Sequence, residues 1–117
     1  MDRQDKFKKN LTNKNNLSDI LNLFNKIKSY TQAERRHFFS TISRKDIKLI
    51  TEVVLNFLKK NIILSKKPLQ LLEKIKESVR KLGSLKTSFK LKKNILTSIK
   101  GLQIISILLM PVLKLLS

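Results

Sequence analysis

The sequence contains no cysteine and no tryptophan, and only two glycines and two prolines among its 117 residues. The lack of cysteine excludes disulfide bridges, thiolate metal sites and cysteine nucleophiles. Two glycines are too few for a glycine-rich phosphate loop. The eight acidic residues are scattered, and the single histidine, His37, has no carboxylate cluster near it in the sequence. We therefore expect a protein that is not an enzyme and that uses no metal ion or cofactor.

Positive charge dominates what the sequence does contain. Lys and Arg number 26 against eight acids, which gives a formal net charge of +18. Residues 59–100 hold thirteen of these cations and only two acids, Glu73 and Glu77. A net charge of this size opposes compaction and attracts phosphate groups or anionic lipid. The hydrophobic content of 41% is nevertheless too high for a fully disordered polycation, so we expect a folded core.

The spacing of apolar residues predicts an all-α chain. Leucine, isoleucine, valine and phenylalanine recur at helical intervals, and no long stretch alternates with the period of a strand. Residues 1–16 are polar and are predicted to form a flexible basic arm. Residues 17–64 are predicted to form three packed helices, residues 65–101 a pair of basic helices, and residues 102–117 an apolar helical tail.

Capping residues predict where these helices begin and end. Helix starts are expected at Asn16 or Ser18, after Thr31, after Ser43, between Ser65 and Pro68 for the fourth helix, and after Ser88. Thr31 is followed three residues later by Glu34, which is the pattern of a capping box. Helix ends are expected at Asn61, Gly83 and Gly101, with Asn61 in the left-handed conformation.

The basic helices predict a surface that neutralises phosphates. The expected contact residues are Lys74, Lys76, Arg80, Lys81, Lys86, Lys90, Lys92 and Lys93. Lys92 falls within the apolar arc of its helix. Lysine is a point charge and does not read bases as bidentate arginine does, and Phe89 is the only aromatic residue of the region. We expect sequence-independent binding of nucleic acid, with double-stranded DNA as the partner.

The apolar tail permits three interpretations. It can be a core helix, it can insert into the surface of an anionic membrane, or it can pack in an interface through which the protein self-associates. The residues expected to enter a membrane are Leu102, Ile104, Ile105, Leu108, Leu109 and Leu113. The uncharged run of residues 101–113 is shorter than the roughly 18 residues typical of a spanning helix.

Several segments of the second half carry a resemblance to a known family. They are NFLKKNIILSKK at 56–67, LEK at 72–74, VRKL at 79–82 and KTSFKLKKNIL at 86–96, preceded by Arg35, Arg36, Phe38 and Phe39. Residues 34–116 resemble short basic proteins of Maverick/Polinton-type transposons and adintovirus-like elements of animals. The family usually has a Gly-Gly pair where Lys100-Gly101 stands, and commonly a small residue where Ile63 stands.

This resemblance implies a virion-associated role, by analogy with the small basic adenovirus core proteins that condense DNA. It implies a location in the virion and the host nucleus, and no catalytic residues. A membrane-active role during entry is the second function that it suggests.

Overall fold

The computed structural model describes residues 14–116, and this part of the chain is built from helices alone, which confirms the predicted all-α fold. The elements are α2 (Lys14–Ser29), α3 (Gln32–Ser40), α4 (Arg44–Leu58), α5 (Lys66–Glu73), α6 (Lys76–Gly83), α7 (Phe89–Thr97) and α8 (Ile99–Leu116). The predicted arm, residues 1–16, lies outside the described residues except for its last three, which begin α2.

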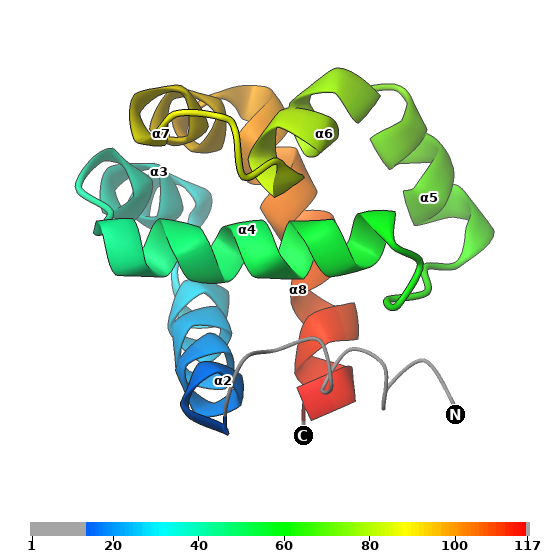
Figure 1. Cartoon of the computed structure of the whole chain (residues 1–117), viewed down its shortest axis with the longest axis horizontal. Coiled ribbons are helices and arrows are strands. Elements are labelled where there is room, and N and C mark those ends of the chain that lie inside the picture. Colours follow the sequence, from blue (N-terminus) through cyan, green and yellow to red (C-terminus); the bar gives the residue numbers. More distant parts are fainter. Residues whose placement is uncertain (1–13, 117) are drawn as a thin grey trace.

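Two long helices, α4 and α8, organise the others. In Figure 1, α4 crosses the front of the molecule, and α8 runs behind it from the upper to the lower part. Helix α4 packs against α6, α2 and α7, whereas α8 packs against α2, α7, α6 and α3. Helices α3, α6 and α7 therefore lie on one side of α4, and α2 lies beside the lower part of α8 (Figure 1).

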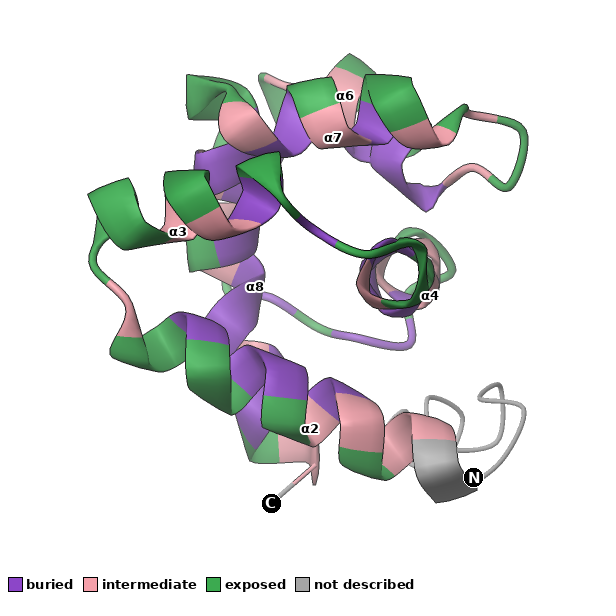
Figure 2. Ribbon diagram, turned by 90° about the vertical axis from the view of Figure 1, so that its left-hand side faces the viewer, coloured by how far each residue is buried: buried purple, intermediate pink, exposed green. Residues whose placement is uncertain are grey.

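A single hydrophobic core joins all seven helices. Its buried residues include Ile20 of α2, Phe39 of α3, Leu72 of α5 and Leu96 of α7. Figure 2 shows that the buried segments of the helices face the interior that they share. The segments predicted as a three-helix unit, a basic helix pair and an apolar tail therefore pack around one core.

The predicted helix starts after Thr31, Ser43 and Ser88 are confirmed, and α5 follows Ser65, whereas α2 begins at Lys14 and not at Asn16 or Ser18. The Thr31 hydroxyl accepts a hydrogen bond from the Glu34 amide at 3.2 Å, and the Glu34 carboxylate accepts one from the Thr31 amide at 2.8 Å, which completes the capping box. The Ser43 and Ser88 hydroxyls likewise accept hydrogen bonds from amides in the first turns of α4 and α7. Each cap satisfies a backbone donor that has no intrahelical partner.

Helix α4 ends at Leu58, and the left-handed position predicted at Asn61 falls one residue earlier. Lys60 has the positive φ of 65°, and Asn61 is buried. The side-chain amide of Asn61 donates a hydrogen bond to Oδ1 of Asn56 at 2.9 Å. Because this buried bond places the Asn61 side chain inside, the left-handed position falls on Lys60, whose side chain is exposed.

The predicted fourth helix, the first of the basic pair, was expected to run from Ser65 to Gly83 and is divided into α5 and α6. The break falls between Glu73 and Lys76, where Ile75 has φ −122° and ψ 31°. It changes the direction of the chain, so that α5 and α6 point different ways (Figure 1). As a result both Leu72 of α5 and Leu82 of α6 are buried.

The two glycines allow helices to approach closely, and neither has a positive φ. A Cβ at Gly83, the last residue of α6, would lie 2.8 Å from Cδ1 of Leu58 on α4. A Cβ at Gly101 would overlap the carbonyl oxygen of Ile95. The prediction that Gly101 ends a helix is therefore wrong. Helix α7 already ends at Thr97, and Gly101 lies in the first turn of α8.

Replacing Gly101→Ala should destabilise the protein by about 1–3 kcal/mol, because the added methyl group must displace the backbone of α7. Urea unfolding followed by far-UV circular dichroism measures the change. Lys100→Ala, at the exposed neighbouring position of α8, is the control and should change stability by less than about 0.5 kcal/mol. Equal stability of the Gly101→Ala variant and the wild type would contradict the close approach of α7 and α8.

The capping box should contribute a pH-dependent part of the stability. Hydrogen bonds to Thr31 lower the pKa of Glu34 below 4.5; the bond with the backbone amide has the larger effect, and the bond with the side chain the smaller. Stabilisation by the ionised Glu34 is therefore fully present above pH 4.5 and is lost as the pH falls through the lowered value. Glu34→Gln keeps the capping pattern without the charge. Thermal unfolding should show the wild type more stable than this variant above that window, and equal to it below; a constant difference would argue against the assignment.

Candidate nucleic-acid interface

The structure places the eight predicted phosphate-binding residues along the chain from the end of α5 to the middle of α7. Six are exposed: Lys74, Lys76, Arg80, Lys81, Lys86 and Lys90. Lys93 of α7 is half-buried, and Lys92 is buried. The six exposed residues are called the cationic surface below.

The cationic surface contains little compensating negative charge. Within the described residues, its one ion pair joins Nη1 of Arg80 to Oε1 of Glu77 at 3.7 Å. Both side chains are largely exposed, so this pair is screened by solvent and contributes little to stability. The remaining charges therefore remain available to an anionic partner.

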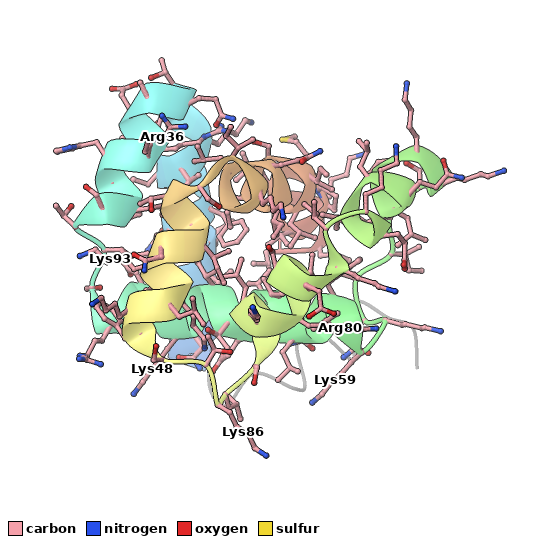
Figure 3. All side chains as sticks on the ribbon, turned by 90° about the horizontal axis from the view of Figure 1, so that it is seen from above. Arg36, Lys48, Lys59, Arg80, Lys86 and Lys93 are labelled. Carbon is pink, nitrogen blue, oxygen red and sulfur yellow. The ribbon has the colours of Figure 1, made fainter. Side chains whose placement is uncertain are left out.

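Helix α4 adds cations to this surface that the sequence analysis did not select. Figure 3 shows Lys48 of α4, and Lys59 directly after its last residue, along the same edge of the molecule as Lys86 and Arg80. They are brought there because α4 packs against α6 and α7. The sequence signal was their position outside the broad apolar arc of α4, but that arc alone does not say which helices lie beside it.

Lys92 does not belong to the cationic surface. Its side chain is only 6% exposed, and its Nζ donates a hydrogen bond to Oγ1 of Thr51 on α4 at 2.7 Å. The prediction that Lys92 is one of the exposed contact residues is therefore wrong. Its position within the apolar arc of α7 was the sequence feature that indicated burial. Burial lowers the pKa of Lys92 below its ordinary value, because the charged ammonium is desolvated.

The six residues expected to enter a membrane are all buried in the core on α8. Ile99–Leu116 is long and apolar enough to cross a membrane, with a mean hydropathy of 1.8, although core helices of soluble proteins pass the same test. In this fold α8 is a core helix, as the first interpretation of the tail expected. Membrane insertion through these six side chains would require α8 to leave the core.

His37 is exposed on α3. Within residues 14–116 no group of three or more His, Asp or Glu side chains is arranged to hold a metal ion.

Comparison of the chain with protein-family models, curated proteins and solved structures found no match. The resemblance to transposon-encoded and adintovirus-like proteins therefore stays a hypothesis.

Replacing Lys92→Met should stabilise the protein by about 1 kcal/mol at neutral pH, because an apolar side chain of similar length replaces a buried charge. The folded-state pKa of Lys92 is lowered from 10.5, so the wild type regains stability as the pH rises through that lowered value toward 10.5. The advantage of the variant should shrink accordingly in urea unfolding at higher pH. The control Lys90→Met, exposed on the same helix, should show no such pH-dependent difference.

Proposed function

We propose that the protein binds nucleic acid without sequence preference and condenses double-stranded DNA. The observation that carries this proposal is the cationic surface, whose six exposed Lys and Arg side chains contain a single ion pair to a nearby acid within the described residues. Lys48 and Lys59 extend the same charge onto α4 (Figure 3). Each phosphate that such a cation neutralises releases condensed counterions, which favours binding.

The size of the molecule agrees with contact over several phosphates. Its longest dimension is 37 Å, close to the about 34 Å of one turn of B-form DNA. Double-stranded DNA carries one charge for about every 1.7 Å of its axis. A molecule of this length can therefore lie alongside many phosphates of one turn of DNA.

The residue types favour backbone contacts over base recognition. Five members of the cationic surface are lysines, and Arg80 is paired with Glu77. Phe89 is half-buried, and the guanidinium of Arg44 lies 4.4 Å from the centre of its ring. One half-buried ring cannot stack the successive bases of a strand, so we propose that the strand is bound through contacts to its phosphates.

The resemblance described above supports a packaging role for this binding. In that role the protein neutralises DNA inside a virus-like particle and is located in the virion and the host nucleus. The high net charge and the lysine-rich surface are the properties that such a role requires.

Affinity for random double-stranded DNA across a salt series tests the proposal. The logarithm of the binding constant should fall against the logarithm of the salt concentration with a slope of about −5 or steeper. Replacing Lys81, Lys86 and Lys90 together by Gln should make the slope shallower by about 2 to 3, because three phosphate contacts are lost.

The matched control replaces Lys26, Lys28 and Lys45 by Gln. All three residues are exposed. Lys26 and Lys28 lie on α2, and Lys45, in the first turn of α4, forms an ion pair with Asp19 of α2. The control removes the same net charge and should change the slope by less than about 1. Equal effects of the two triple variants would disprove a localised surface. Weak binding with a shallow slope would contradict DNA as the partner, and anionic vesicles would then be tested.

A further inference from the structure

A pocket between α4 and α7 contains a buried cation that the cationic surface does not use. The pocket has a volume of about 420 Å³ and is lined by Arg44, Ile47, Lys48, Thr51, Glu52, Leu85, Thr87, Phe89 and Lys92. A volume of this order is typical of sites for small organic ligands.

Lys92 is poorly compensated in this position. Its ammonium group has three hydrogens, and its one hydrogen bond goes to Oγ1 of Thr51. No carboxylate of the described residues lies within ion-pair distance of it. A buried charge is costly unless it is paired and hydrogen-bonded, so the site favours an anion that approaches Nζ of Lys92.

The other charged groups of the pocket indicate how much negative charge it accepts. Arg44 and Lys48 add two cations, and Glu52 adds one carboxylate. The Glu52 carboxylate faces the amide of Asn16 at 3.4 Å, and burial raises the pKa of Glu52. With three cations and one carboxylate, the lining has a formal charge of +2 when Glu52 is ionised. A phosphate monoester carries about −1.5 to −2 at pH 7, whereas a single carboxylate carries half of that.

The walls of the pocket are apolar and fit an organic body attached to the anion. Ile47, Leu85 and Phe89 supply these walls. Leu85 is 81% exposed in the connection between α6 and α7, so its side chain is accessible to a ligand in the pocket. Arg44 is already held over the ring of Phe89, so its guanidinium lies at the pocket before a ligand binds.

We propose that this pocket is a discrete binding site for a phosphate monoester with an apolar or aromatic body, such as a nucleotide. The phosphate lies against Lys92, Arg44 and Lys48, and the body lies against Leu85 and Phe89. The ligand can be a free nucleotide or the phosphorylated end of a DNA strand, since both present the same group. This site uses none of the six residues of the cationic surface, shares only Lys48 with the extension of that charge onto α4, and takes one phosphate at a time.

Isothermal titration of the full-length protein with thymidine 5′-monophosphate, thymidine and inorganic phosphate tests the site. The monophosphate should bind saturably with one site per chain, inorganic phosphate more weakly, and thymidine not measurably. Lys92→Met should weaken binding of the monophosphate by about tenfold or more, because a charged hydrogen-bond donor is lost. The control Lys90→Met, which removes the same charge from the exposed side of α7, should change it by less than about threefold.

A second variant, Leu85→Ser, should weaken binding of the monophosphate but leave binding of inorganic phosphate unchanged, because only the organic body contacts Leu85. Short duplexes with 5′-phosphate or 5′-hydroxyl ends then distinguish the two sources: preference for the phosphorylated end assigns the site to DNA ends, and equal binding of both duplexes assigns it to free nucleotides.

The proposed binding site would be disproved if the monophosphate did not bind saturably, or if the Lys92→Met variant bound it as tightly as the wild type. Circular dichroism confirms that the variants are folded. The salt-dependent affinity for long DNA should be the same for Lys92→Met and the wild type, so failure of the pocket and failure of the proposed function are distinguishable.

Discussion

Helix α8 is the element on which the rest of the structure depends, because it packs against α2, α3, α6 and α7. Its buried side chains include Ile104, Ile105 and Leu108, which are fully enclosed. Burial of apolar area stabilises by about 25 cal/mol per Å². In a chain with a net charge of +18, this burial has to offset the mutual repulsion of the cations. The close approach of α7 and α8 at Gly101 brings the basic helices to the core.

The few acidic residues interact mostly outside the basic helices and do not neutralise them. Glu34 completes the capping box of α3, and Asp19 pairs with Lys45. Glu77 pairs with Arg80 within the same helix. The exposed charge of α5, α6 and α7 is therefore a consequence of where the acids lie, and it is the physical basis of the proposed binding of DNA.

Packing between α4 and α7 separates two kinds of lysine that look alike in the sequence. Lys90 and Lys92 lie two residues apart on α7, yet one is exposed and the other is buried against Thr51. The exposed lysine keeps its hydration and can meet a phosphate of a long polyanion at the surface. The buried lysine has lost most of its hydration, and this is why a compact anion in the neighbouring pocket is the partner that we propose for it.

The sequence by itself determined the all-α fold, the three N-terminal caps and the basic character of the second half, because these depend on short-range hydrogen bonding, helical periodicity and net charge. It also marked Lys92 as lying in an apolar arc. Only the tertiary structure decided that α8 is a core helix, that the predicted fourth helix is divided at Ile75, and that Gly83 and Gly101 serve close packing. Those outcomes depend on contacts between residues far apart in the chain, and a local pattern does not specify which helix faces which.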